Sequence, residues 1–347
     1  MTNILFLIGN GFDLNVGLKT SFKDVSKIYL NSSSDKPYIN EFKKEIKEYP
    51  DLWSYFEKQF GLYAEKFSLK NVDEYHDCLK DFRGVLINHL RQEESRINYD
   101  LHEDEIISVF KNSIMNVYSS LEDESKNIIS SLVSPHTAVI YNFITFNYTN
   151  ILEKCLSLLK PSIFTRKTSL PTGQPIAYQD SRGEIIYIHG TTGRSPIIGV
   201  DNEKQINNTE LIQDDRFKKK IIKPIENDNS RNSKNEKTKG LILNSQVIII
   251  FGMALGETDG TWWIQIVQWL KNRNNHHLVI FIYDPVYNPI NIEDKIDIEE
   301  NAMLQLFRIS GVEQELGNYR QQIHISINSD IFKINLVNEN ENIEIRA

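Results

Sequence analysis

The 347-residue sequence has little cysteine and no long apolar run, and each absence excludes a class of protein. Its two cysteines, Cys78 and Cys155, have no metal-ligand spacing and cannot form a disulfide framework, so we expect buried thiols in a reducing compartment. The central run "LILNSQVIIIFGMAL" is interrupted by Asn244, Ser245 and Gln246, well short of the roughly 20 residues of a membrane span. The N-terminus lacks the basic segment of a signal peptide. We expect a soluble, cytoplasmic protein with no membrane partner.

An excess of basic charge is also missing. The sequence has 39 Lys and Arg against 47 Asp and Glu, a net charge of −8, whereas a nucleic-acid surface normally needs a basic field. We therefore expect no direct nucleic-acid binding. Hydrophobic residues at 40% and charged residues at 25% are typical of a globular chain, and the length suffices for one large domain or two coupled ones.

Apolar runs that alternate with helical patterns indicate an α/β fold with a parallel sheet. Residues 4–8 are apolar without alternation, as in a central strand covered on both faces. Further strand-like runs are "TAVIYNFITFNYTN", "EIIYIHGTTG", "QVIIIFGMALGETD", "HHLVIFIYDP" and "QIHISI". Patterns such as "NILEKCLSLLK" and "TWWIQIVQWLKNRNN" lie between them and predict helices.

The chain divides into a core, a helical insertion and a polar segment. Residues 26–135 show apolar spacings of three and four and predict a helical insertion subdomain within a core of residues 1–25 and 136–347. Residues 201–240 are polar and charged. We interpret them either as a mobile loop over or beside the site or as a solvated loop without a role.

The first strand ends in "IGNGFD", a turn that suits either a nucleotide site or a simple change of direction. In parallel sheets, ligands bind outside the carboxyl ends of the strands. Gly9 allows a sharp exit, Asn10 tolerates unusual backbone angles, and Gly11 permits close approach of a phosphate. Asp13 either caps the next helix or faces a ribose or the reacting centre.

Three later strands also end in polar or glycine-rich residues, so four strand ends are predicted to converge on one crevice. These later ends contain Thr145, Asn147, His189, Gly190, Gly252, Glu257, Thr258 and Asp259. A histidine with an ordinary pKa near neutrality can serve as an acid or base, although one that ends an apolar strand often only bonds a carbonyl. Residues 257–259 alternatively cap the tryptophan-rich helix that follows.

Taken together, these motifs resemble a known family. "IGNGFDLNVGLKTSF", with "FNYTN", "IHG" and "FGMALGETD", resembles the pattern of AbiH, a bacterial phage abortive-infection family, over most of the chain. Their order is more distantly similar to the sirtuin-type NAD-binding fold. The resemblance implies a sirtuin-like Rossmann sheet with a large helical insertion.

The resemblance also implies roles for particular residues. Asn147 and His189 are the implied catalytic residues, with His189 as the acid or base, and we add Asp13 as a catalytic candidate because a carboxylate can stabilise a cationic transition state. The implied NAD-binding residues, from the pyrophosphate to the adenosine half, are Gly9, Asn10, Gly11, Phe12, Thr145, Gly190, Gly252 and Asp259. Sirtuin deacetylases hold a zinc module with four cysteines, which this chain cannot build, so we predict no metal and no protein deacetylation.

The expected activity is that of an NAD glycohydrolase, which cleaves NAD as its substrate into nicotinamide and ADP-ribose during anti-phage defence. Such an enzyme must be silent in healthy cells, which implies control by a phage-derived or host activator, or by assembly into a homo-oligomer. The alternatives are a non-catalytic module that senses NAD or ADP-ribose, an ADP-ribosyl transferase and a nucleotide phosphohydrolase.

Overall fold

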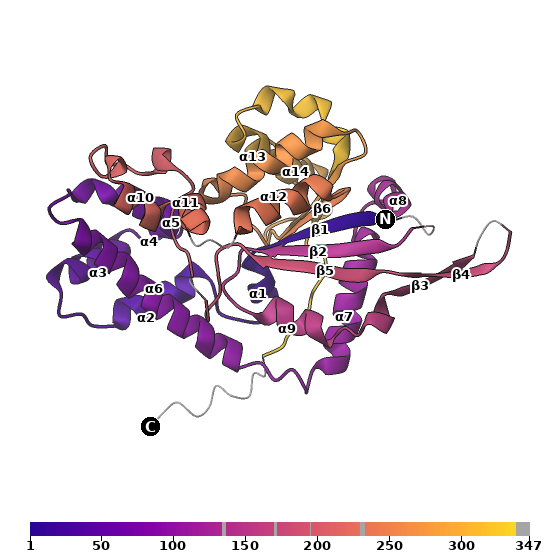
Figure 1. Cartoon of the computed structure of the whole chain (residues 1–347), viewed down its shortest axis with the longest axis horizontal. Coiled ribbons are helices and arrows are strands. Elements are labelled where there is room, and N and C mark those ends of the chain that lie inside the picture. Colours follow the sequence, from indigo (N-terminus) through magenta and orange to yellow (C-terminus); the bar gives the residue numbers. More distant parts are fainter. Residues whose placement is uncertain (134–136, 170–171, 195, 230–232, 338–347) are drawn as a thin grey trace.

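The apolar run near the N-terminus forms β1 (Thr2–Ile8), at the centre of a six-stranded sheet (Figure 1). The computed structural model describes residues 1–133, 137–169, 172–194, 196–229 and 233–337. The strands follow the order β5-β2-β1-β6-β7-β8, and every neighbouring pair is parallel. Numbered along the chain, this is the order 3-2-1-4-5-6 of doubly wound α/β folds that bind dinucleotides. The predicted parallel α/β sheet is therefore confirmed.

The remaining elements have the following bounds. The other strands are β2 (Val139–Thr145), β3 (Thr165–Ser169), β4 (Pro175–Gln179), β5 (Ser181–Tyr187), β6 (Val247–Phe251), β7 (His277–Ile282) and β8 (Ile323–Ile327), of which β3 and β4 form a separate antiparallel hairpin. The helices are α1 (Gly11–Asn15), α2 (Phe22–Asn31), α3 (Pro37–Glu48), α4 (Pro50–Trp53), α5 (Phe56–Tyr63), α6 (Val72–Ser95), α7 (Glu103–Met115), α8 (Asp123–Leu132), α9 (Ile151–Leu158), α10 (Asp215–Ile221), α11 (Lys223–Asn229), α12 (Lys234–Asn244), α13 (Gly260–Asn272) and α14 (Ile292–Ile309).

Helices cover both faces of the sheet, which explains why its strands are apolar without alternation. Ile4, Phe6 and Ile8 face a core shared with α1, α7, α8, α9 and residues 331–337. Leu5 and Leu7 face the opposite core, which α12, α13 and α14 complete above the sheet in Figure 1. Within the described part of the chain, no helix has the length and apolar content needed to cross a bilayer.

The residues predicted as one helical insertion are shared between two cores. Helices α7 and α8 pack on the sheet. Helices α2 to α5 and the first half of α6 instead build a third core rich in aromatic side chains, on the left of Figure 1. The expected boundary between insertion and core, residues 134–136, lies outside the described residues.

The described part of the segment 201–240 is folded rather than loop-like. It contains α10, α11 and the start of α12, and it places Leu211, Phe217 and Ile221 in the third core beside the aromatic side chains of the insertion. This folding could not be read from composition, because the few apolar residues of the segment are widely spaced among charged ones. The segment and the insertion therefore form one structural unit.

Helix α6 ties this unit to the sheet through contacts with backbone groups near the strand ends. The Glu94 carboxylate accepts from the Asn150 amide at 2.5 Å, and Arg91 donates to the Thr192 carbonyl. Because these are charge-assisted bonds to backbone groups of the core, the second half of α6 is held firmly beside the strand ends.

Close backbone packing accounts for three glycines at the strand ends. The amides of Gly9 and Gly11 donate to the carbonyls of Phe251 and Gly252 at 3.0 and 2.7 Å. A Cβ on Gly11 would lie 2.5 Å from the Gly252 Cα, and Gly252 itself has a φ of +68°. The turns after β1 and β6 thus touch backbone to backbone, at the point where the strand order reverses.

We expect Gly11→Ala to lower the free energy of unfolding by about 2–3 kcal/mol, because the added methyl must push two turns apart. Gly84→Ala is the matched control. Gly84 lies inside α6 with open space around its Cα, so alanine there should raise stability by about 1 kcal/mol. Urea denaturation of the three proteins measures both changes. Equal stability of Gly11→Ala and the unsubstituted protein would contradict the packing argument.

Candidate functional site

The sheet register brings the ends of four strands to one level. Ile8 at the end of β1 pairs with Thr145 of β2 and with Phe251 of β6, and Thr145 also pairs with Tyr187 of β5. Residues a few positions beyond these ends therefore meet above the same edge of the sheet. This is the edge at which parallel α/β proteins bind their ligands.

Asp13 and Asn147 meet directly at this edge. The Asn147 side chain donates to Asp13 Oδ1 at 2.9 Å, and the Thr149 hydroxyl donates to Asp13 Oδ2 at 2.8 Å. Asp13 is only 1% exposed, and it is the third residue of the one-turn helix α1. Its carboxylate therefore binds side chains of the neighbouring strand end and does not cap the helix. The amide of Asn147 donates to the Thr145 hydroxyl, which holds this turn in place.

Burial changes the acidity of Asp13. Desolvation disfavours its charged form and raises its pKa to about 7, against the opposing hydrogen bonds from Thr149 and Asn147 and with a smaller contribution from Glu94. A carboxyl group with a pKa near neutrality exchanges protons at physiological pH. It can act as a general base or as a negative charge beside a developing cation.

A cavity of about 170 Å³ opens beside this pair, between the sheet edge and the insertion. Its polar lining includes Asp13 and Asn147. The apolar wall comes from both units and consists of Phe22, Val25, Phe56, Phe82, Leu86, Leu90, Phe146, Tyr148 and Ile198. A cavity of about 150 Å³ accommodates benzene, so this space suits one planar ring with a polar edge. No described residue hydrogen-bonds to the buried Oδ1 of Asn147, which leaves that oxygen free to accept from such a ring.

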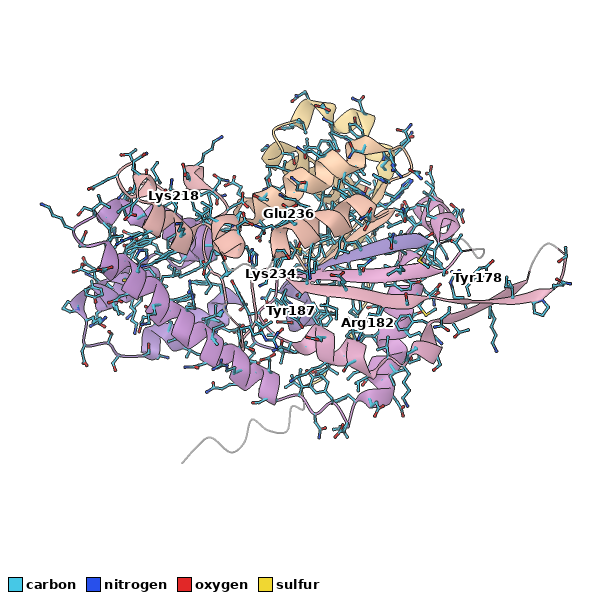
Figure 2. The ribbon with its side chains drawn as sticks, in the orientation of Figure 1. Tyr178, Arg182, Tyr187, Lys218, Lys234 and Glu236 are labelled. Carbon is cyan, nitrogen blue, oxygen red and sulfur yellow. The ribbon has the colours of Figure 1, made fainter. Side chains whose placement is uncertain are left out.

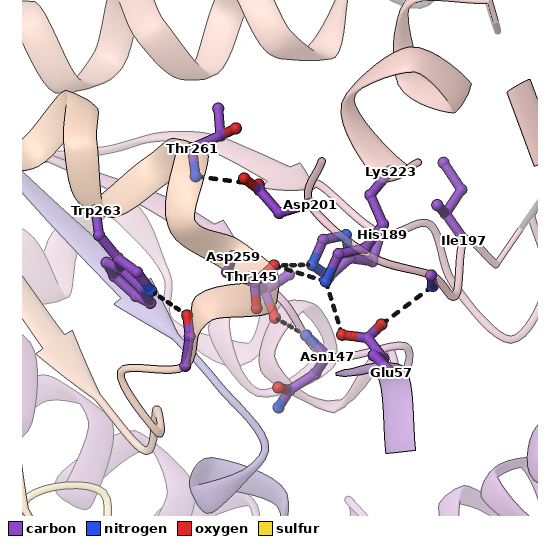
Figure 3. Close-up of polar contacts among 12 residues, drawn as sticks. Glu57, Thr145, Asn147, His189, Ile197, Asp201, Lys223, Asp259, Thr261 and Trp263 are labelled. Carbon is purple, nitrogen blue, oxygen red and sulfur yellow. Dashed lines mark hydrogen bonds and ion pairs between the residues drawn. The ribbon is translucent and has the colours of Figure 1, made fainter. Parts of the chain in front are cut away.

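A second polar cluster adjoins the cavity through Glu57 (Figure 3). Lys223 Nζ lies 2.7 Å from Glu57 Oε2 and 2.9 Å from Asp259 Oδ1, and His189 Nε2 lies 2.9 Å from the same Asp259 oxygen. The four residues come from α5, α11, the strand end after β5 and the turn after β6. We call Glu57, His189, Lys223 and Asp259 the quartet.

The quartet has a buried half and a partly exposed half, because Glu57 and Asp259 are 22% and 18% exposed. The side chains of Lys223 and His189 are 3% and 5% exposed. Burial alone would raise the pKa of Asp259, but the Lys223 charge and His189 outweigh it and hold that pKa well below its usual range. Burial likewise opposes the charge of Lys223, and the carboxylates of Asp259 and Glu57 reverse the effect and keep its pKa above the ordinary value.

Asp259 does not cap the helix that follows it. Its carboxylate contacts Lys223 and His189, whereas the Thr261 amide near the start of α13 donates to Asp201 at 3.0 Å (Figure 3). Asp259, predicted either to bind NAD or to cap this helix, thus contacts the predicted histidine.

The other predicted NAD-binding residues lie around the same edge in different roles. The Asn10 side chain exchanges hydrogen bonds with Thr20 and lines the cavity. Phe12 is fully buried in the core below the sheet. Gly190 has a φ of +77°, which allows the chain to turn directly after His189. The amides of Gly9 and Gly11 donate hydrogen bonds to carbonyl groups of the turn after β6 and of its strand end.

Sequence reasoning missed Glu57 and Lys223. Both lie in helical stretches far from any strand end, where charged side chains are expected to face water. A weak signal was available for Lys223, since it directly precedes Pro224 within an apolar and basic stretch, but nothing in that stretch indicates two carboxylate partners. Thr149 was also missed, although it belongs to the quoted motif "FNYTN".

These features define a class of protein: a doubly wound parallel α/β protein whose strand ends and helical insertion enclose a ring-sized cavity beside a buried acid. The described residues contain no group of three or more His, Cys, Asp or Glu side chains placed to hold a metal ion. The family model for bacteriophage abortive infection AbiH matches residues 5–281, and the chain therefore belongs to the AbiH family. This membership indicates a role in abortive infection as a defence against phage. The comparison with curated proteins gave no match.

Proposed function

We propose that this AbiH-family protein is an NAD glycohydrolase that cleaves the bond between nicotinamide and ribose during abortive infection. The observation that carries the proposal is the cavity itself. It combines aromatic walls with the Asp13 carboxyl and a free Asn147 carbonyl oxygen at the edge where doubly wound folds bind dinucleotides. A volume of about 170 Å³ suits the nicotinamide ring, and the rest of NAD would extend outside it.

The reaction needs little acid catalysis, because the leaving group is already cationic. The C1′–N bond breaks and its electron pair stays on the pyridine nitrogen, so neutral nicotinamide departs and positive charge builds on the ribose. Water then forms the new C1′–O bond and loses one proton. The products are nicotinamide, ADP-ribose and that proton.

Each of the three catalytic candidates has a role that its surroundings support. Ionised Asp13 would stabilise the positive charge on the ribose, and Asn147 would hold the carboxamide or a ribose hydroxyl through its free oxygen. His189 packs against Phe146 and Tyr148, two residues that line the cavity, and would accept the proton of the attacking water.

Two other functions use the same site. A non-catalytic sensor would bind NAD or ADP-ribose without turnover. An ADP-ribosyl transferase would pass the ribose to a nucleophile other than water. Product analysis separates these functions from hydrolysis.

The test is incubation of the purified protein with NAD, with free nicotinamide and ADP-ribose followed by chromatography. We expect both products in equal amounts, and at least a ~100-fold lower rate for Asn147→Ala and for His189→Ala. His102→Ala and Asn318→Ala serve as matched controls at positions outside the cavity lining and the quartet. Extract from phage-infected cells is added in a parallel series to supply an activator.

The outcomes separate the candidate functions. Nicotinamide without an equal amount of ADP-ribose would indicate a transferase. Binding of NAD by calorimetry with no products, in both series, would indicate a sensor. If NAD is cleaved but both Asn147→Ala and His189→Ala keep full activity, the reaction is correct and the proposed site is wrong.

A further inference from the structure

The two ring nitrogens of His189 have different surroundings. Nε2 faces Asp259 Oδ1 at 2.9 Å, whereas no described residue hydrogen-bonds to the buried Nδ1. An ionised carboxylate only accepts, so Nε2 must carry the hydrogen in this contact. A neutral imidazole has one N–H, and its lone pair therefore lies on Nδ1. The nitrogen without a protein partner is the one that can accept a proton.

A carboxylate alone would not leave His189 in this neutral form. A negative charge at hydrogen-bond distance favours the doubly protonated imidazolium, in which Nδ1 carries a proton and is useless as a base. Lys223 opposes this effect, because its ammonium shares the same Asp259 oxygen at 2.9 Å. In a buried site the attraction between this lysine and the carboxylate is only weakly screened by solvent.

We propose that Lys223 is a positioning residue that keeps His189 neutral, with the hydrogen on Nε2 and with Nδ1 free to receive the proton of the attacking water. The inference deepens the proposed function and rests on it for the identity of the reaction. It assigns no contact between Lys223 and the substrate. Lys223 acts through Asp259, and Glu57 holds the other side of its ammonium at 2.7 Å.

Lys223 is the lysine that shares the Asp259 carboxylate with His189, and the other ionisable groups of this region lie around Tyr148. Tyr148 packs on the imidazole and donates its hydroxyl to the Ile197 carbonyl, so it is occupied. The other ionisable groups around Tyr148 are Glu57, Arg83 and Glu226. Burial raises the pKa of Glu226 to about 7, against the opposing charge of Arg83, so this acid is partly neutral near pH 7.

The direct test is the protonation state of His189, read from the ¹⁵N chemical shifts of its two ring nitrogens in histidine-labelled full-length protein. His189→Gln assigns the signals. We expect the unsubstituted protein at pH 7.5 to show the Nε2–H form with an unprotonated Nδ1. In Lys223→Met, the two ring nitrogens should instead show the shifts of the doubly protonated imidazolium at the same pH, because Asp259 then faces His189 alone.

Two further variants keep the test informative if Lys223→Met folds poorly. Lys223→Arg retains the positive charge and should behave as the unsubstituted protein does. The double variant Glu57→Gln/Lys223→Met loses the second carboxylate together with the lysine, and it should still show the imidazolium shifts at His189. Lys218→Met is the matched control. Lys218 lies on α10 in the same segment (Figure 2) and also bridges two carboxylates, those of Glu203 and Asp215, but at the surface.

Activity supplies a second readout, the pH profile of nicotinamide release. If Lys223 sets the charge of His189, Lys223→Met should lose at least about ten-fold in rate at pH 7 and should regain rate as the pH is raised. Loss of structure would lower the rate at every pH. Lys218→Met should leave the profile unchanged.

The results distinguish this inference from the proposed function. Unchanged ring-nitrogen shifts in Lys223→Met, or an Nδ1–H form in the unsubstituted protein, would overturn the role of Lys223 whatever the enzyme catalyses. Absence of nicotinamide release with the expected shifts would instead refute the hydrolase and leave the charge assignment standing.

Discussion

Asp13→Asn is expected to make the protein more stable at pH 8 and to abolish nicotinamide release. Burial raises the pKa of Asp13 to about 7, so at pH 8 the folded protein holds a charge that the unfolded chain would solvate in water. Asparagine removes that cost and still offers Thr149 and Asn147 hydrogen-bonding atoms. The proposed reaction loses the negative charge beside the ribose, and we expect at least a ~100-fold lower rate.

The sign of the stability change follows from proton binding. Between the unfolded pKa of 3.8 and the folded value of about 7, the folded protein binds more protons at Asp13 than the unfolded chain does. The Asp13 contribution to stability is therefore lost as pH rises through this range, and it stays constant above it. The difference between these two pKa values corresponds to about 4 kcal/mol in favour of Asp13→Asn at pH 8.

Urea denaturation of both proteins at pH 5, 6.5 and 8 measures this effect. Other groups that titrate in the same range, such as Glu226, are present in both proteins and cancel in the difference. The gap between the two unfolding free energies should widen from pH 5 to pH 8. A gap that does not change with pH would show that Asp13 has an ordinary acidity in the folded protein.

Lys223→Met is expected to give the largest loss of stability at a single position of the site. It leaves the carboxylates of Glu57 and Asp259, which are 22% and 18% exposed, without the buried cation that they share, and breaking such an ion pair costs about 3 kcal/mol. The expected loss is smaller in a Glu57→Gln background, because one of the two uncompensated charges is then absent.

A double-mutant cycle measures the coupling between Lys223 and Glu57. We expect an interaction free energy of about 1–3 kcal/mol from urea denaturation of the unsubstituted protein, Glu57→Gln, Lys223→Met and the double variant at pH 7.5. Additive effects would mean that Glu57 and Lys223 do not depend on each other for stability. Because Glu57 belongs to the insertion and Lys223 to the segment 201–240, the cycle measures one of the contacts that join them.

Local patterns in the sequence carried the prediction of the sheet and of one part of the site. The apolar strands, and the polar residues directly after them, predict a shared edge, because parallel strands in register end at one level. Asp13, Asn147 and His189 could be chosen this way, since each stands only a few residues beyond a strand end. The glycines were also identifiable, although close packing between Gly11 and Gly252 appeared only when two turns 241 residues apart were brought together.

The side chains that surround Asp13, Asn147 and His189 come from distant parts of the chain and depend on tertiary packing. Strand periodicity and turn chemistry are local properties of the chain, so the sequence predicts a parallel α/β sheet with acids and a histidine at its carboxyl edge. It could not indicate that Glu57 and Lys223 turn inward, because a charged residue on a helix has no local feature that separates a solvated position from a buried pair. The cavity and the quartet form only when the insertion and residues 201–240 pack against the sheet edge.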